Sequence, residues 1–215
     1  MSRTKNHVKV VLFIQNQNHI DFEESLTKMK KLEIQSFLNE IFHLDNDAID
    51  QILDFTEFME CQKGDILIQE GKRHLYFYFI IKGAVKSYYH VEDKEICSWF
   101  AFENEMIATI KTFAGETSNE TIELLEDTTF IKIQTEKFKK LADNNLTWSH
   151  IMSALISSHA IFLEDRIKLQ FMPSKERYNK LIQSEPQILQ RVSLTDISSF
   201  LGMSRENLSR IRSEK

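Results

Sequence analysis

Cysteine is scarce in this chain of 215 residues, which contains only Cys61 and Cys97. The two residues form no Cys-x-x-Cys pair, so they provide neither a zinc-ligand set nor a disulfide framework, and this usage indicates a reducing compartment. Long apolar runs are also lacking, since none approaches the ~20 residues that span a bilayer. The run of five from Val10 to Ile14 is too short for the core of a signal peptide. The sequence therefore predicts a cytoplasmic protein with no membrane partner.

An excess of positive charge is missing as well. The formal net charge is −5, which argues against a general nucleic-acid coat. The charge is unevenly spread, because residues 172–215 hold eight Lys and Arg against five Asp and Glu, which leaves 19 basic and 27 acidic side chains elsewhere. A basic C-terminal region on an acidic body is typical of a DNA-binding module attached to a sensor or scaffold.

The last 24 residues, 192–215, predict two short helices around a tight turn. Ser193 and Asp196 have the spacing of a capping box. Gly202 ends the first helix, because glycine takes a positive φ without steric cost, and Ser204 is placed to cap the second. The positions expected to face inward are Ile197, Phe200, Leu201, Leu208 and Ile211. This order is that of a helix-turn-helix, whose second helix enters the DNA major groove.

The second of these helices carries the side chains that would contact DNA. Arg205, Glu206 and Arg210 are the candidates for reading base edges, since arginine pairs with guanine and a carboxylate accepts from cytosine N4. Candidate phosphate contacts are Thr195, Ser199, Ser204, Asn207, Ser209 and Arg212. The alternative is a solvated pair of amphipathic helices in which Glu206 and Arg210 form an i,i+4 ion pair.

At these residues the chain resembles a known family. Residues 204–211 (Ser-Arg-Glu-Asn-Leu-Ser-Arg-Ile) resemble the recognition helix of the cyclic-AMP receptor protein/Fnr (Crp/Fnr) transcription factors, and residues 174–182 resemble the start of that family's DNA-binding domain. The resemblance implies a transcriptional regulator that reads a palindromic operator in double-stranded DNA as a homodimer, with RNA polymerase as a further partner. It also implies that Arg205, Glu206 and Arg210 read the bases.

The middle of the chain changes from helix to strand. Helical spacing extends over about 22–58, and short β-branched and aromatic segments then alternate with turns at Gly64, Gly71 and Gly83, which predicts a small antiparallel sandwich or jelly roll. The predicted strands are 66–69, 75–81, 85–91, 95–102, 121–125 and 128–134. The turn glycines resemble the family pattern, which implies a cyclic-nucleotide-binding β-roll. A cupin-like roll stays open from the strands alone, although no metal-ligand motif surrounds His74 or His90.

Residues 104–121 fall where the resemblance places the phosphate-binding cassette. Nucleotide-binding members of the family use a Gly-Glu pair and an Arg-Ser/Thr pair there, whereas this chain has Ala108 and Thr109, and then Ser118 or Asn119. A buried phosphate needs a cation or free amides, and the segment offers at most Lys111. The sequence therefore disfavours cyclic AMP in the usual mode and predicts no certain cofactor. The candidate pocket for an unknown small-molecule effector comprises Ala108, Thr109, Ser118, Asn119 and Thr121.

Residues 145–171 predict one long helix. A 4-3 spacing, the register of a coiled-coil seam, runs through Trp148, Met152, Leu155, His159, Phe162, Arg166 and Leu169. These positions predict the dimer interface, while Ile151, Ile156, Leu163 and Ile167 widen the stripe and are expected to pack on the roll. The alternative is that the whole helix packs within one subunit. Proline at 173 predicts a hinge after it.

The overall expectation is an α+β protein. Residues 1–24 are an N-terminal extension, in which alternation at Val8, Val10, Leu12 and Ile14 allows a short strand, and 25–144 form the effector domain. Residues 145–172 form the dimerisation helix and hinge, and 173–215 form a winged helix-turn-helix with its wing before the motif. The predicted function is a non-enzymatic, DNA-binding regulator. The alternatives are a ligand-binding or interaction module with a vestigial helix-turn-helix, and an enzyme on a cupin-like roll, for which a nucleophile–base set is lacking.

Overall fold

The computed structural model describes residues 29–44 and 46–214, and the chain divides into two compact units, 1–54 and 55–215. In the first unit, residues 29–42 are helical and α2 spans Asn46–Leu53. Ile49, Ile52 and Leu53 are the buried positions of α2, which is the i, i+3, i+4 pattern of an amphipathic helix. The expected extension over 1–24 and its short strand lie outside the described residues.

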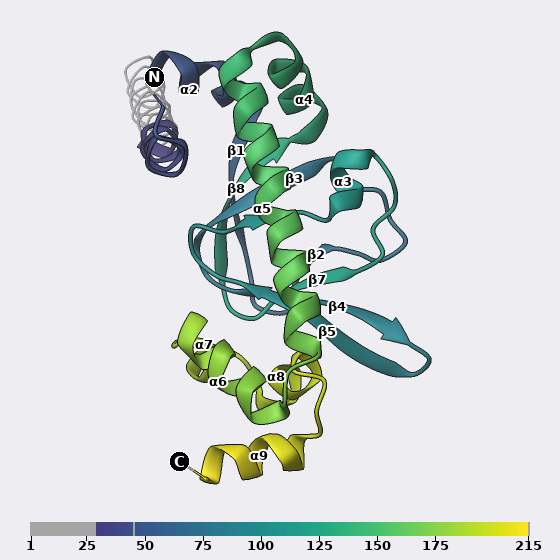
Figure 1. The fold of residues 1–215 in the computed structure, drawn as a ribbon. Helices are drawn as coiled ribbons and strands as arrows, with labels where there is room; N and C mark the ends of the chain where they lie inside the picture. The colour runs from purple at the N-terminus through teal and green to yellow at the C-terminus, as the bar shows by residue number, and fades with distance from the viewer. Residues whose placement is uncertain (1–28, 45, 215) are drawn as a thin grey trace, which may run out of the picture. The chain divides into compact units, whose positions relative to one another are not determined.

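The second unit contains a β-roll made of two antiparallel four-stranded sheets, ordered β1-β8-β3-β6 and β2-β7-β4-β5 (Figure 1). The strands are β1 (Thr56–Cys61), β2 (Ile66–Ile68), β3 (Tyr76–Lys82), β4 (Val85–Val91), β5 (Lys94–Ala101), β6 (Met106–Ile107), β7 (Thr121–Leu124) and β8 (Thr128–Gln134). The mixed α and β class with a β-roll, as predicted from the sequence, is confirmed.

One part of the expected helix is wrong. Helical spacing predicted helix as far as residue 58, whereas Thr56–Cys61 forms β1. This segment pairs along its whole length with β8, from Thr56 opposite Ile133 to Cys61 opposite Thr128. The partner strand lies about 70 residues away in the chain, so long-range ladder bonds override the local helical pattern. The two-residue strand β6 was not predicted either, since so short a segment carries no periodic signal.

The roll core fills the space between the two sheets. Inward residues of β3, β4, β7 and β8, among them Ile80, Val85, Ile122 and Phe130, are fully buried. Gly83, in the turn between β3 and β4, has φ +119°, and a Cβ there would lie 2.3 Å from Thr128 Oγ1. The turn therefore requires glycine for both its backbone conformation and its contact with β8.

Helices follow the roll in sequence. They are α3 (Ile110–Ala114) within the roll, then α4 (Thr135–Asn144), α5 (Leu146–Gln170), α6 (Ser174–Ser184), α7 (Ile188–Arg191), α8 (Leu194–Phe200) and α9 (Arg205–Ser213). Asn145 caps α5 by accepting hydrogen bonds from the amides of Thr147 and Trp148. Figure 1 shows α5 running along the roll, with α6–α9 gathered beyond its C-terminal end. The long helix predicted over 145–171 is confirmed.

The helices α6–α9, residues 173–214, form a helical module that shares a core with the roll. Tyr178, Ile188 and Leu208 are buried in one cluster with Cys97 and Phe102 of the roll region. The rings of Phe100 on β5 and Phe200 on α8 lie 5.3 Å apart, centroid to centroid. Roll and helical module are therefore packed together, because their apolar faces bury one another.

The wing expected before the motif is absent from the described residues 173–192. The segment that should form it contains the short helix α7, and Ile188 and Val192 are buried one turn apart. Pro186 lacks the N–H that a strand ladder needs. The segment therefore forms a short helix that buries Ile188 and Val192, and not the β-hairpin expected for a wing.

Candidate nucleic-acid interface and effector pocket

The caps predicted for α8 and α9 are formed. Ser193 Oγ accepts from the Asp196 amide at 3.1 Å and donates to the Asp196 carboxylate at 2.7 Å. Gly202 has φ +60° at the turn between the helices, and Ser204 Oγ accepts from the Asn207 amide at 3.2 Å. Leu208 and Ile211 point into the core, as expected from their spacing. Local capping and one glycine thus fix where α9 begins and which of its faces is buried.

The opposite face of α9 is exposed. It forms an open concave surface lined by Arg205, Glu206, Ser209, Arg210 and Ser213. Within the described residues Arg210 forms no ion pair with Glu206, and its Nη2 instead donates to Asn207 Oδ1 at 2.9 Å. The backbone amide of Glu206 itself, and then the Ser204 hydroxyl, hold the pKa of the Glu206 carboxyl below its usual value. The face therefore presents two guanidinium groups and a stable carboxylate side by side.

The six candidate phosphate contacts divide into two groups. Thr195, Ser204, Ser209 and Arg212 are exposed and Asn207 is half-buried. Ser199 differs, because its Oγ accepts from the Cys97 amide at 2.9 Å and donates to the Glu95 carbonyl at 3.3 Å. Both partners lie on β5, so the Ser199 hydroxyl is used in the contact between roll and helical module.

A buried lysine reinforces the contact between α8 and the roll. Lys86 on β4 is 8% exposed, and its Nζ lies 2.8 Å from Glu95 Oε1 and 3.2 Å from Asp196 Oδ1. Burial alone would lower the pKa of Lys86, but the hydrogen bonds to Glu95 and Asp196 offset this and raise it. The lysine is therefore charged and joins the first turn of α8 to the sheet.

A second ionic contact is made by α7. Arg191 donates to both carboxylate oxygens of Glu103, at 2.7 and 2.8 Å, and also pairs with Glu126. These hydrogen bonds lower the pKa of Glu103 to about 2. The guanidinium carbon lies 4.9 Å from the ring centroid of Phe102. Two charged contacts and one hydroxyl contact thus link the roll to the helical module.

Three of the seven residues predicted as the dimer seam of α5 contact their own chain: Trp148, Arg166 and Leu169. Trp148 is fully buried and Leu169 is 8% exposed, so neither can lie between two copies. Arg166 Nε donates to the Ser98 carbonyl at 3.1 Å and its Nη2 to the Phe200 carbonyl at 2.5 Å, so it joins the roll to α8. Met152, Leu155 and His159 are half-buried on the same face, and Phe162 is 39% exposed.

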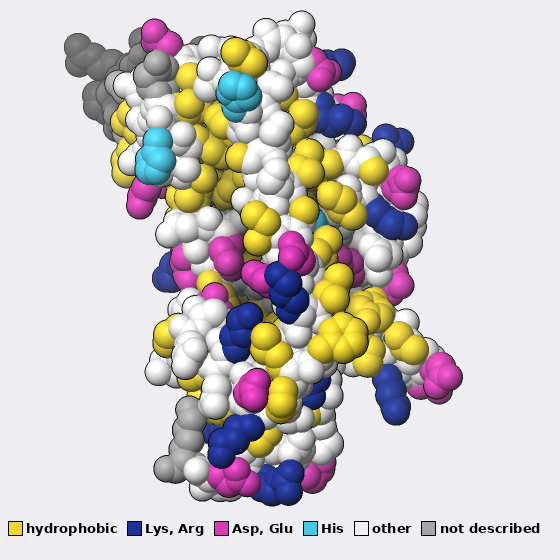
Figure 2. Space-filling model, in the orientation of Figure 1, with side chains coloured by type: hydrophobic (Ala, Val, Ile, Leu, Met, Phe, Trp, Pro, Cys, Tyr) yellow, Lys and Arg dark blue, Asp and Glu magenta, His cyan; other side chains and the backbone are white. Residues whose placement is uncertain are grey.

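A second apolar stripe on α5 is exposed. Ile156, Leu163 and Ile167 are 40, 43 and 60% exposed, and Ala160 lies between them. Their spacing is also 4-3-4, and Figure 2 shows apolar side chains along this helix. Of the described helices, α5 alone has the length and apolar composition that a membrane crossing requires. That composition reflects two apolar stripes, one partly buried and one more exposed.

The hydroxyls of the predicted effector pocket are bonded to the chain itself. Thr109 Oγ1 caps α3 by accepting from the Thr112 amide at 3.2 Å. Ser118 Oγ donates to the Glu120 carbonyl at 2.7 Å, and Thr121 Oγ1 accepts from the Glu70 amide at 3.2 Å. Ala108 is buried and Asn119 is exposed. The one cation of the segment, Lys111, is paired with a carboxylate, since its Nζ lies 3.8 Å from Glu116 Oε2. The five candidates thus do not form an open polar site.

A carboxylate lies at the centre of this region. One oxygen of Glu120, Oε2, accepts from Ser98 Oγ at 2.9 Å, from Trp99 Nε1 at 2.9 Å and from Ser87 Oγ. Ser87 comes from β4 and the other two donors from β5, so a residue preceding β7 reaches across the sheet. None of the three donors carries charge. The Glu120 side chain therefore occupies the donors of Ser87, Ser98 and Trp99 that a ligand at this position would need.

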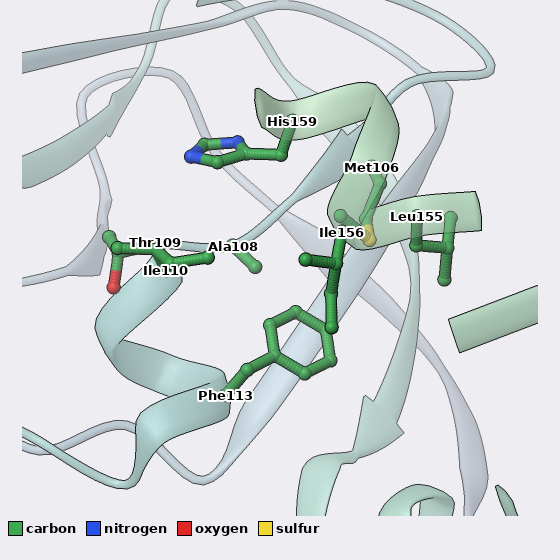
Figure 3. A pocket seen from close by; sticks show the side chains of 8 residues that line it. All are labelled: Met106, Ala108, Thr109, Ile110, Phe113, Leu155, Ile156 and His159. Carbon is green, nitrogen blue, oxygen red and sulfur yellow. The ribbon is translucent and has the colours of Figure 1, made fainter. Parts of the chain in front are cut away.

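The hollow beside this region is very small. It has a volume of about 10 Å³ and lies between α5 and the segment leading into α3, and Figure 3 shows Ile156 of α5 directed toward Phe113 and His159 on the side of Thr109. Such a volume admits about one water molecule. Burial lowers the pKa of His159, and the nearby Glu120 partly offsets this. The hollow is too small for a nucleotide.

Comparison with known proteins bears on the fold. Residues 58–145 match the family model of the cyclic nucleotide-binding domain. FixK2 from Bradyrhizobium japonicum is similar in structure, with a TM-score of 0.66 and 19% identity over 74% of this chain and 83% of FixK2. A protein from Eubacterium rectale described as a transcriptional regulator of the crp/fnr family has a TM-score of 0.63 and 17% identity over 79% of this chain and 82% of that one. The fold of this chain is similar to that of these two proteins.

The predicted Crp/Fnr resemblance is therefore confirmed. The Thermus thermophilus catabolite activator protein is a further similar structure, with a TM-score of 0.51 and 17% identity over 81% of this chain and 85% of that protein. A search of curated proteins found no matching sequence. At these identities the likeness concerns the fold alone.

Several residues that connect the parts of this structure were not predicted from the sequence. Lys86, Glu120 and Arg191 were missed because their partners are distant: Glu120 bonds to side chains 21 to 33 residues away. One signal was available for Arg191, since it is a basic residue in a short amphipathic segment and lies just before the first cap. For Glu120 the local sequence carried no signal.

Proposed function

We propose that the chain is a transcriptional regulator that binds DNA through a helix-turn-helix formed by α8 and α9. The observation that carries this proposal is the exposed face of α9, on which Arg205, Glu206 and Arg210 lie together. The chain buries Leu208 and Ile211 on the other face and caps both helices. A helix that is held firmly and presents unpaired charged side chains is suited to entering a groove.

In this proposal each side chain has a specific role. Arg205 and Arg210 donate two hydrogen bonds each to guanine O6 and N7, and Glu206 accepts from cytosine N4. Phosphate contacts come from Thr195, Ser204, Asn207, Ser209 and Arg212. Ser199 contacts phosphate only after its hydrogen bonds to Cys97 and Glu95 on β5 break.

The homodimer is formed by α5, with a seam that differs from the sequence prediction. The stripe Ile156, Ala160, Leu163 and Ile167 has coiled-coil spacing and is exposed along the helix. Pairing with a second copy would cover these side chains, whereas Trp148 and Leu169 are already covered by their own chain. A two-fold dimer reads a palindrome with half-site centres about one DNA turn apart.

The remaining parts keep their predicted roles in the proposal. Residues 25–144 are the effector domain, 145–172 the dimerisation helix and hinge, and 173–215 the DNA-binding domain, while 1–24 are an extension. The effector domain has a rebuilt pocket that does not take cyclic AMP in the usual mode, because Glu120 holds the donors and Lys111 is paired. The protein acts in the cytoplasm, without catalysis, and with RNA polymerase as a further partner.

The proposal is tested by selection from a random DNA pool. Purified protein without added effector is incubated with the pool, and bound DNA is amplified and sequenced. We expect an enriched two-fold palindrome. A variant with Arg205→Ala and Arg210→Ala, which leaves the caps and the buried face intact, is the control and should enrich no sequence. If wild-type protein and this variant give the same unenriched pool, both alone and with small molecules from cell extract, the helix-turn-helix is vestigial and the proposal is wrong.

A further inference from the structure

A cavity of about 270 Å³ lies between β5, α5 and the helices α6–α8. It differs from the hollow of about 10 Å³ between α5 and the segment leading into α3 in being large enough for a small organic molecule, since about 150 Å³ already holds benzene. Three aromatic rings line it: Phe100 from the roll, Phe162 from α5 and Phe200 from α8. An apolar body is therefore well accommodated.

The charged side chains around the cavity do not balance. The carboxylates are Glu105, Asp165 and Glu185, and the cations are Arg166 and Lys180. The guanidinium of Arg166 is bonded to the backbone carbonyls of Ser98 and Phe200 and lies 4.0 Å from the Phe200 ring centroid. Lys180 makes no ion pair or hydrogen bond within the described part of the chain. The lining thus holds three carboxylates against two cations, and Asp165 also lies 3.9 Å from Lys168 Nζ. Within the described residues, Glu105 and Glu185 are the lining carboxylates that no ion pair neutralises.

Two of these carboxylates are in an unfavourable setting. Burial raises the pKa of Glu105, and the nearby Glu185 and Glu103 raise it further. Burial likewise raises the pKa of Glu185. Glu105 belongs to the roll and Glu185 to the end of α6, so the two sides of the cavity each contribute one poorly solvated carboxyl. A cation placed between them would stabilise the charged form of both carboxyl groups.

We propose that this cavity binds a small organic cation, with an apolar body about the size of one aromatic ring and a protonated amine. The apolar body packs among Phe100, Phe162 and Phe200, and the ammonium pairs with Glu105 and Glu185. Aromatic faces also attract cations, which adds to the selectivity for an amine. The site does not depend on DNA binding.

The regulatory consequence does rest on the proposed function. The cavity walls belong to both the roll and the helical module, so its width changes if the two parts move relative to each other. A ligand shifts a conformational equilibrium only if it binds the two states differently, and a site that spans both parts meets that condition. Its occupancy would therefore alter the availability of α9 for DNA.

The experiment is calorimetric titration of the full chain, without DNA, with three probes of matched apolar body: 2-phenylethylamine, 2-phenylethanol and 3-phenylpropionate. We expect the amine to bind at least tenfold more tightly than the other two. The double variant Glu105→Gln and Glu185→Gln should weaken amine binding at least tenfold, while Asp143→Asn, an exposed carboxylate on α4, should leave it unchanged.

A second variant guards against misfolding of the first. Ser184 lines the cavity, and Ser184→Phe fills it without removing a charge, so it should abolish binding of the amine. Tighter binding of the propionate, held by Lys180, would overturn the proposal in favour of an anion site. Absence of amine binding, or amine binding that neither variant changes, would also overturn it. Because no DNA is present, these outcomes are separate from failure of the DNA selection.

Discussion

The interior of the roll and the exposed face of α9 use polar side chains in opposite ways. In the roll, the hydroxyls of Ser87, Ser98 and Ser118 and the Glu120 carboxylate are bonded to one another or to the backbone. On α9, Arg205 and Glu206 are exposed, and no salt bridge ties either to the rest of the described chain. Polar groups that are satisfied within the chain stabilise the fold, and those left exposed are available to a partner.

The helix α5 shows the same contrast within one element. On one stripe, Trp148 packs against Phe138 of α4, Arg166 bonds to the roll and α8, and Leu169 is buried with the helical module. The other stripe, with Leu163 and Ile167, is open. Both have coiled-coil spacing, so spacing alone does not distinguish the stripe that contacts its own chain from the stripe that is exposed.

The largest effect is expected from charging the open stripe. The double variant Leu163→Glu and Ile167→Glu should raise the dimer dissociation constant about a thousandfold, because about 4 kcal/mol of apolar burial is lost from the seam. Sedimentation equilibrium measures this constant. Ile161→Glu is the matched control: Ile161 is as exposed as Ile167, at 60%, but lies outside the stripe. If the control dissociates the dimer and the double variant does not, the seam is misplaced.

The next effect concerns the closed interior. Glu120→Ala leaves three donors, from Ser87, Ser98 and Trp99, without their acceptor. The free energy of unfolding should fall by about 3 kcal/mol, measured by urea denaturation. Glu116→Ala, an exposed glutamate on the other side of the cassette, should change it by less than about 0.5 kcal/mol. Equal stability of the two variants would show that the carboxylate is not a structural group.

On α9 we expect substitutions to weaken DNA binding and to leave the stability of the fold unchanged. Arg205→Ala and Arg210→Ala should each weaken DNA binding by about 1–3 kcal/mol and relax the base preference at the contacted position. Neither should change the free energy of unfolding by more than about 0.5 kcal/mol. Quantitative binding to the selected palindrome and to its single-base variants provides the measurement. Arg212→Ala, a phosphate contact, should instead weaken all sequences alike and reduce the salt dependence. A variant at Arg205 or Arg210 that keeps the wild-type sequence preference would exclude that residue from base reading.

The smallest effect comes from the ion pair between Glu103 and Arg191. The pKa of Glu103 is lowered from 4.5 to about 2. Because the folded-state pKa is the lower one, the pair's contribution is complete above about pH 4.5 and disappears as the pH falls toward 2. A double-mutant cycle with Glu103→Gln and Arg191→Met should give a coupling of about 1 kcal/mol at pH 6, since Glu103 is partly exposed. The coupling should be near zero at pH 2. A coupling that does not vary with pH would contradict this assignment.

The elements with strong local signals were predictable. Strands β4 and β8, the helix α5 and the caps at Ser193 and Ser204 agree with the sequence prediction. Each of these signals depends on residues that are near in sequence. A strand is indicated by alternating apolar and polar residues, and a helix by apolar residues repeating about every 3.6 positions. A cap is indicated by a hydroxyl three residues before the amide from which it accepts a hydrogen bond.

The parts that failed depend on distant partners. β1 is a strand because β8 pairs with it, and α7 replaces a wing because Ile188 and Val192 are buried in the shared core. The function of Glu120 follows from donors on two other strands. The burial of Trp148 depends on Phe138 of α4, and the contacts of Arg166 depend on β5 and α8. None of these facts is contained in local spacing.

The Glu120 side chain fills its position independently of the concentration of any ligand. A ligand that diffuses into a site leaves it when its supply falls, so the protein's state follows the metabolite level. The Glu120 carboxylate is attached by covalent bonds to the strand whose neighbours it bonds, and it cannot be diluted. That position is therefore filled by the chain itself, whatever the concentration of any diffusible ligand.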